Sequence, residues 1–243
     1  GYRNDNFTTY AYVSDDLGST WKLLTQNFKQ NAANVILEDS ENENILYLGT
    51  DNGLFISTDK GLTWQDFSAD IPNVAVHDLV IQSREKDLIV ATHGRSLYKV
   101  NIANIQQINE TINGKEMTLF QVEDVCFSEN WGNKSYTWGD DAVPSVAIWY
   151  YLKNISNIGI TIKNKGGVVV FNRQAKAEKG MLKMDYDLSI DEKTKIAIEK
   201  KDVNMKINQA ANKKYYLPVV NYVVELETNG KKETRTLIIK ERK

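Results

Sequence analysis

Five polar residues are the candidates for binding or catalytic chemistry: Asp51, Asn52, His77, His93 and Arg95. The two histidines are the only ones in the chain, and imidazole exchanges protons near neutral pH. The planar guanidinium of an arginine suits a carboxylate. Glycoside hydrolysis needs two facing carboxyl groups, and the sequence sets no second acid beside Asp51. These residues therefore predict ligand binding, and no catalytic residue is identified.

Each candidate also has a purely structural interpretation. Gly94 can be a turn glycine, and Arg95 can hold the carbonyl groups of its own loop. His77 can cap the turn that precedes its strand. The choice between these roles and ligand binding depends on the elements that carry the residues.

Those elements include a repeated turn. The segments Ser14–Trp21 and Ser57–Trp64 both read S-x-D-x-G-x-T-W and begin 43 residues apart, and a four-stranded propeller blade takes about 40–45 residues. The matching residues are Ser14, Asp16, Gly18, Thr20 and Trp21 in the first copy, and Ser57, Asp59, Gly61, Thr63 and Trp64 in the second. We expect each aspartate to accept hydrogen bonds from its own turn and each glycine to take a positive φ. We expect each tryptophan to be buried between neighbouring sheets. These roles are all structural.

Alternating apolar residues divide the first hundred residues into blades. Residues 1–24 supply the outer two strands of one blade, residues 33–67 a complete blade, and residues 76–100 three strands of another. Hairpins alternate between the two faces of a propeller, so the five candidate residues share the face opposite the repeated turns. Little more than two blades cannot close into a propeller and would leave long strand edges exposed. We therefore expect the chain to be the C-terminal part of a larger protein, with the preceding blades as its partner.

The remaining sequence predicts a bridge over 101–135 and a β-sandwich over 136–243. The bridge holds a short helix at 102–108 and a strand at 117–122. Asn229-Gly230 is a strong signal for a tight hairpin between the last two strands. The sandwich strands are expected at 146–153, 159–163, 167–171, 182–188, 195–199, 222–228 and 234–240.

Bulk properties exclude several classes of function. A net charge of −2 gives no reason to expect nucleic acid as a partner. No apolar run approaches the roughly 18 residues that would span a membrane. Cys126, the lone cysteine, rules out an intramolecular disulfide and is expected to be a buried apolar residue. No zinc-binding pattern or phosphate-binding loop occurs, so neither a metal nor a cofactor is predicted.

The repeated turn resembles the Asp-box (BNR) repeat of sialidases, sortilin/Vps10-like receptors and bacterial propeller glycoside hydrolases. Segments 44–55, 72–80 and 87–98, the last with its Thr-His-Gly-Arg quartet, are most similar to the sortilin-like bacterial proteins often labelled glycosyl hydrolases. Segments 148–152, 179–188 and 222–231 resemble the FlgD-like, immunoglobulin-type domain that follows the propeller in such proteins. The expected fold is thus all-β, with terminal propeller blades followed by an immunoglobulin-like sandwich.

The resemblance implies a secreted, periplasmic or outer-surface bacterial protein whose signal peptide lies outside this chain. Our leading hypothesis is a non-catalytic role in binding glycan or protein. One alternative is a glycoside hydrolase whose catalytic residues lie mainly in the preceding blades. A sialidase needs an arginine cluster and a tyrosine nucleophile, and this sequence offers only Arg95 on the expected face. Another alternative is a scaffold component of a surface or secretion complex.

Overall fold

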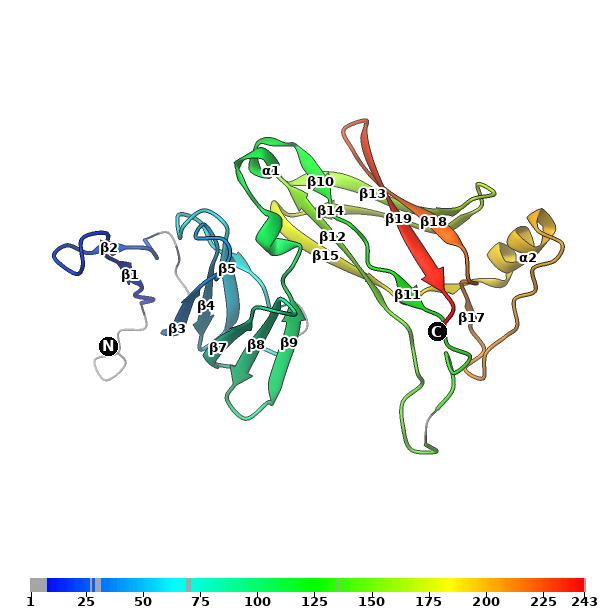
Figure 1. Ribbon diagram of the computed structural model, residues 1–243, viewed down its shortest axis with the longest axis horizontal. Coiled ribbons are helices and arrows are strands. Elements are labelled where there is room, and N and C mark those ends of the chain that lie inside the picture. Colours follow the sequence, from blue (N-terminus) through cyan, green and yellow to red (C-terminus); the bar gives the residue numbers. More distant parts are fainter. Residues whose placement is uncertain (1–7, 27, 29–31, 69–70, 135, 243) are drawn as a thin grey trace. The chain divides into compact units, whose positions relative to one another are not determined.

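The computed structural model describes all residues except 1–7, 27, 29–31, 69–70, 135 and 243 (Figure 1). The chain divides into two compact units, Gly1–Asn109 and Glu110–Lys243. Both units are built from strands, which confirms the all-β class. Among the described residues, no helix is long and apolar enough to cross a membrane.

The first unit contains three antiparallel sheets that follow one another along the chain (Figure 1). The first is a two-stranded hairpin of β1 (Tyr12–Val13) and β2 (Lys22–Leu23). The second is the complete four-stranded blade predicted from the sequence, in the order β3-β4-β5-β6. Its strands are β3 (Ala33–Glu38), β4 (Leu46–Thr50), β5 (Gly53–Ser57) and β6 (Gln65–Asp66). Every residue of β4 and β5 is buried, so these two strands form the blade's core.

The third sheet has three strands, as predicted: β7 (Val76–Gln82), β8 (Asp87–Thr92) and β9 (Leu97–Asn101). It packs against the second sheet at Gly49, where a Cβ atom would lie 2.7 Å from the Val76 side chain. Only a residue without a side chain permits this approach. The two sheets are therefore curled blades in direct contact.

The two repeated turns differ in how they pack, which corrects one prediction. Trp64 lies against the preceding hairpin, and its indole Nε1 donates to the Leu24 carbonyl at 3.2 Å. Both tryptophans were expected to be buried; Trp64 is partly buried, whereas 61% of Trp21 is exposed. Its indole donates instead to the carbonyl of Gly18 in its own turn, at 3.1 Å. The repeat supplies the turn, whereas burial of its tryptophan depends on a neighbouring sheet.

The second unit is formed by two sheets packed over one hydrophobic core, which includes Ile148 and Met184 from one sheet and Ile160, Val224 and Leu237 from the other. The smaller sheet has the order β10-β12-β15, and the larger the order β11-β19-β18-β13-β14. The strands are β10 (Met117–Leu119), β11 (Val125–Cys126), β12 (Val146–Leu152), β13 (Ser156–Asn164), β14 (Val169–Ala177), β15 (Gly180–Tyr186), β18 (Asn221–Thr228) and β19 (Lys231–Lys240). A further short pair joins β16 (Ser189–Ile190) to β17 (Tyr215–Tyr216).

Most of the strands expected in this unit are confirmed within a few residues. The predicted hairpin at Asn229-Gly230 is present, with both residues at positive φ between the paired Thr228 and Lys231. The segment 101–135, predicted as a bridge, contributes β10 and β11 to the two sheets. Its predicted helix is shorter, a 3-10 turn η2 (Ile105–Gln107), and is followed by α1 (Glu110–Gly114).

The strand predicted at 195–199 is wrong, because these residues lie in helix α2 (Glu192–Lys201). Asp191 caps the helix by accepting a hydrogen bond from the Thr194 amide at 2.7 Å. Lys195 and Glu199, one turn apart, form an ion pair at 3.0 Å. Capping and charge pairing therefore prevail over the short apolar alternation that suggested a strand.

Cys126 also departs from expectation. It was predicted to be a buried apolar residue, but the structure shows it exposed. It is the last residue of β11, which pairs in parallel with the end of β19. Side chains alternate between the two faces of a strand, and because Val125 of β11 packs against the core, Cys126 points away from it.

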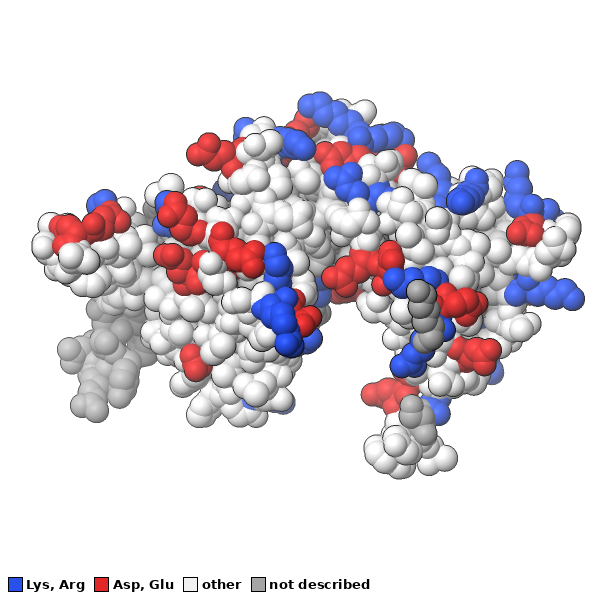
Figure 2. Space-filling view, viewed as in Figure 1, with Lys and Arg blue, Asp and Glu red and all other residues white. Residues whose placement is uncertain are grey.

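Charged side chains are scattered over the visible face of both units, and basic and acidic groups often lie close to one another (Figure 2). Many of them form surface ion pairs, such as Lys60–Glu43 at 2.6 Å and Lys86–Glu41 at 2.9 Å. Such exposed pairs contribute little stability each. This mixed distribution agrees with the small net charge of the chain.

Candidate functional site

The candidate site is the end of the second and third sheets that lies opposite the repeated turns. Strand β5 begins directly after the turn at Asp51 and Asn52 and ends in the repeated turn at Ser57, so these two loops are at opposite ends of one strand. We call this end the rim and define it by six residues: Asn34, Asp51, Asn52, His77, His93 and Arg95.

On the β3–β6 blade, the rim is formed by a side-chain pair next to a β-bulge. The register between β3 and β4 shifts between Ala33 and Val35, which leaves Asn34 as the extra residue. The Asn34 side chain donates from Nδ2 to Oδ1 of Asp51 at 3.0 Å. The Asp51 backbone N–H donates to the Ala32 carbonyl at 3.2 Å, which fixes the start of the turn. Bulges of this kind re-aim a side chain, and they are common next to functional sites.

The next blade repeats this arrangement with different side chains. The register between β7 and β8 shifts between Val76 and Asp78, which leaves His77 as the extra residue. The ring centroid of His77 lies 5.3 Å from that of His93. The His93 backbone N–H donates to the Ala75 carbonyl at 2.9 Å. His77 thus corresponds to Asn34, and His93 corresponds to Asp51.

Both turns of the rim are held by a threonine hydroxyl. Thr50 Oγ1 donates to the Gly53 carbonyl at 3.2 Å, and Thr92 Oγ1 donates to the Ser96 carbonyl at 2.7 Å. The residue that accepts has a positive φ in each case, 119° at Gly53 and 93° at Ser96. A residue with a side chain rarely adopts this conformation, and such strain collects at functional sites. The backbone is therefore strained at Ser96 in the β8–β9 turn, whereas a glycine, Gly53, occupies the matching position of the β4–β5 turn without strain.

Arg95 projects from the longer of the two turns. It is exposed, and so are both histidines and Asp51. A Cβ atom added to the neighbouring Gly94 would have nothing within 4 Å, which shows that the tip of this turn is open. The rim thus presents two amides, a carboxylate, two imidazoles and a guanidinium to solvent. These groups suit hydrogen bonding to a polar or charged ligand.

The structure keeps the predicted candidates in two local groups. Asp51 and Asn52 share one turn, and His77 lies beside His93 with Arg95 two residues further along the chain. Sequence reasoning missed Asn34, which the structure joins to Asp51. The signal was available in the sequence, because Asn34 precedes His77 by 43 residues, the same interval as between the repeated turns.

Both carboxylate oxygens of each motif aspartate, Asp16 and Asp59, accept hydrogen bonds within their own turn. Both oxygens of Asp59 are engaged, Oδ1 by the Thr63 amide at 2.8 Å and by Ser57 Oγ at 2.8 Å, and Oδ2 by Thr63 Oγ1 at 2.6 Å. Asp16 accepts the same set of hydrogen bonds from Thr20 and Ser14. The hydrogen bonds from Thr20 hold the pKa of Asp16 below its ordinary value. These aspartates therefore close hairpins.

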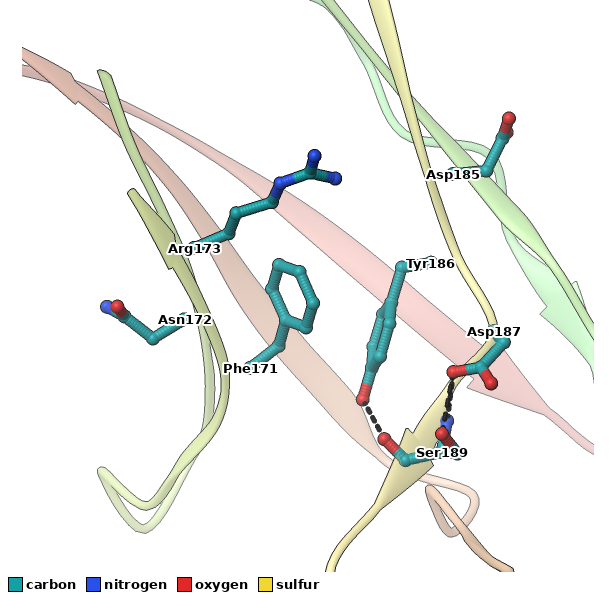
Figure 3. Close-up of a pocket in the computed structure, with 7 residues that line it drawn as sticks. All are labelled: Phe171, Asn172, Arg173, Asp185, Tyr186, Asp187 and Ser189. Carbon is teal, nitrogen blue, oxygen red and sulfur yellow. Dashed lines mark hydrogen bonds between the residues drawn. The ribbon is translucent and has the colours of Figure 1, made fainter. Parts of the chain in front are cut away.

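A second polar hollow lies in the other unit, between the edge strands β14 and β15, with a volume of about 490 Å³ (Figure 3). Phe171 and Arg173 extend from β14, and the ring of Phe171 lies 4.5 Å from that of Tyr186. The acids of this hollow are already paired, Asp185 with Lys183 and Asp187 with Lys214. The hollow is lined by Phe171, Asn172, Arg173, Asp185, Tyr186, Asp187 and Ser189. The rim is the stronger candidate because more of its polar groups are open to solvent.

Comparison with known proteins identifies the family. The family model Sortilin-Vps10, described as sortilin, neurotensin receptor 3, matches residues 9–235. This chain belongs to the Sortilin-Vps10 family. The match covers both units, and within it lie the two repeated turns and the rim.

Two solved structures show distant similarity to this Sortilin-Vps10 chain. One is the extracellular domain of a hybrid two-component system from B. thetaiotaomicron, with 9% identity and a TM-score of 0.29. The other is dimeric latent PorU from Porphyromonas gingivalis, with 10% identity and a TM-score of 0.28. The alignments cover 93% and 98% of this chain but only 27% and 18% of those proteins. No curated protein matches the chain.

Proposed function

We propose that this Sortilin-Vps10 chain is the closing part of a secreted or surface-exposed β-propeller protein that binds glycan or protein without catalysis. The observation that carries the proposal is the rim. Two consecutive blades each use a β-bulge to bring a pair of polar side chains to the same end of the sheet, Asn34 with Asp51 and His77 with His93. Repetition of the device with changed side chains is typical of a scaffold adapted to recognise a ligand.

The carboxylate chemistry of the rim supports a binding role. Hydrolysis of a glycosidic bond uses two carboxyl groups about 5–10 Å apart, one of which must donate a proton. Asp51 is the only acid among the six rim residues, and it already accepts a hydrogen bond from Asn34. The aspartates of the repeated turns lie at the opposite end of the strand. Arg95 and Asp51 are instead suited to complementary polar contacts.

We further propose that another blade packs against the exposed first hairpin. Trp64 shows the contact that such a blade makes, since its indole donates to the Leu24 carbonyl and its ring lies 6.0 Å from Phe28. Trp21 occupies the equivalent position one repeat earlier and is 61% exposed, and the nearby Tyr12 is 50% exposed. A similar blade would cover both rings. The β-sandwich of the second unit, which we propose to be of the immunoglobulin type, would be an accessory domain.

The experiment uses the intact protein that contains this chain, on a glycan array and in a hydrolysis assay with any glycan that binds. Substitution of Arg95 by alanine is expected to weaken binding about tenfold or more, the value of a hydrogen bond to a charged group. Arg84→Ala is the matched control, because Arg84 lies in the β7–β8 turn at the other end of the same sheet and forms an exposed ion pair with its neighbour Glu85.

A release of product from a bound glycan would contradict the non-catalytic proposal and favour a glycoside hydrolase. Equal binding by the Arg95→Ala and Arg84→Ala variants would contradict the assignment of the rim. Protein ligands recovered by affinity capture are tested with the same two variants. For glycan and protein ligands alike, the criterion is a loss of binding in Arg95→Ala that Arg84→Ala does not show.

A further inference from the structure

We propose that His77 and His93 form a binding site for a divalent transition-metal cation of the zinc, nickel or copper class. These are the only histidines of the chain, and they are 16 residues apart in sequence. The structure nevertheless holds their rings with centroids 5.3 Å apart and both side chains exposed. Imidazole nitrogen is a preferred ligand of these cations.

The ring separation fits joint coordination of one ion. A zinc–nitrogen bond is about 2.0–2.1 Å long, and the ring centroid lies roughly 1.1 Å behind the nitrogen. Two imidazoles bound at a tetrahedral angle therefore have centroids about 5.2 Å apart. The observed 5.3 Å agrees with this value. The planes are inclined by 33°, so the rings are not stacked flat on each other.

Backbone contacts hold the two histidines next to each other. His77 is the extra residue of a β-bulge, and the His93 N–H is fixed to the Ala75 carbonyl. His77 lies in β7 and His93 directly follows β8, its antiparallel neighbour, so the bulge and the His93–Ala75 hydrogen bond fix the backbone of both residues. A preformed pair loses little conformational freedom on binding, which favours chelation by both rings.

The site offers two protein ligands and leaves the remaining positions open. No group of three or more histidine, cysteine, aspartate or glutamate side chains suited to a metal occurs within the described part of the chain. Water, or a donor group of a bound molecule, would complete the coordination. The proposal does not rest on the glycan or protein ligand proposed above, because metal binding can be measured without one.

The preceding blade provides an internal control. Asn34 and Asp51 occupy the positions equivalent to His77 and His93, and their side chains meet at 3.0 Å. Imidazole nitrogen suits this class of cation better than carboxylate and amide oxygens do, and those oxygens are the preferred ligands of harder ions. The backbone geometry is thus present twice, whereas the imidazole pair is present once.

The test is calorimetric titration of the full chain with zinc chloride, followed by nickel chloride, at pH 7.5. All variants carry Cys126→Ser, because the exposed thiol of Cys126 is itself a metal ligand.

The background variant, which carries Cys126→Ser alone, is expected to bind one equivalent of zinc. His77→Gln and His93→Gln are each expected to abolish this isotherm at the same concentrations. The double variant Asn34→His/Asp51→His is expected to bind a second equivalent. Circular dichroism and thermal unfolding in a chelator confirm that each variant is folded.

Three outcomes overturn the proposal. The first is the absence of saturable binding in the background variant. The second is binding that survives in both glutamine variants, since the metal would then be bound elsewhere. The third is a folded Asn34→His/Asp51→His variant that still binds one equivalent, because the bulge geometry would then not create a site.

Discussion

Replacing Gly61 by alanine tests whether the repeated turn joins neighbouring blades as well as closing its own hairpin. Gly61 has φ +85°, and a Cβ atom built on it would lie 3.0, 3.1 and 3.3 Å from three side-chain atoms of Leu24. Gly18 is the matched position of the first turn. Its φ is +91°, and its Cβ atom would meet only the Trp21 ring, at 3.7 Å. The two substitutions therefore share the backbone strain and differ in the contact between blades.

The expected magnitudes follow from these two contributions. An alanine in the left-handed region costs about 1–2 kcal/mol, and the restricted unfolded chain offsets about 0.4–1 kcal/mol of that. Gly18→Ala is thus expected to lower the free energy of unfolding by roughly 1 kcal/mol. Gly61→Ala adds an overpacked contact with Leu24, which costs a further 1–3 kcal/mol or so.

The assay is hydrogen exchange measured by mass spectrometry on peptides that cover the β1–β2 and β5–β6 hairpins, supported by urea unfolding of the whole chain. Local exchange is needed because two separate units do not unfold as one transition. A Leu24→Ala substitution provides space for the new methyl group. The double variant Gly61→Ala/Leu24→Ala should therefore be more stable than the sum of the single effects predicts, by about 1–3 kcal/mol.

Equal destabilisation by Gly18→Ala and Gly61→Ala would refute the reasoning, because strain would then be the only cost. Additive effects of Gly61→Ala and Leu24→Ala would refute it independently. The turn would in that case close its hairpin without contributing to the contact between blades.

Two further predictions concern buried and capping hydrogen bonds. Tyr47 is fully buried, and its hydroxyl donates a hydrogen bond to Asp39 at 3.1 Å. Tyr47→Phe is therefore expected to lower the free energy of unfolding, measured in urea, by about 1.5–3 kcal/mol. The control Tyr12→Phe, at a half-exposed position, is expected to change it by no more than about 0.5 kcal/mol. Equal losses of unfolding free energy in Tyr47→Phe and Tyr12→Phe would contradict this expectation. Asp191→Ala is expected to cost about 1 kcal/mol and to speed exchange in α2 only. Hydrogen bonds from Thr194 hold the pKa of Asp191 below its ordinary value. The cap is therefore complete above the ordinary pKa of an aspartate and is lost as the pH falls through the lowered pKa. Hydrogen exchange in α2 that did not change over this pH range would argue against the cap.

The sequence alone was sufficient for features decided within a few residues. In each repeated turn, the aspartate, the glycine and the threonine lie within eight residues, and the hydrogen bonds of Asp59 all come from Ser57 and Thr63. The strands of the complete blade and the hairpin at Asn229-Gly230 were predictable for the same reason. Local hydrogen bonding and apolar alternation act before the chain has folded into sheets, so they can be read from the order of residues.

The tertiary structure decided the features that depend on contacts between distant segments. The pairing of His77 with His93 needs a bulge in β7 and the register of β8, neither of which is marked by a local motif. Trp21 and Trp64 end the same motif but differ in exposure, because Trp64 packs against Leu24 and Phe28 whereas the Trp21 indole bonds within its own turn. Cys126 is exposed because its neighbour Val125 takes the core-facing position of the same short strand. Burial and side-chain proximity are properties of packed sheets, and a repeat that specifies one hairpin does not specify what lies beside it.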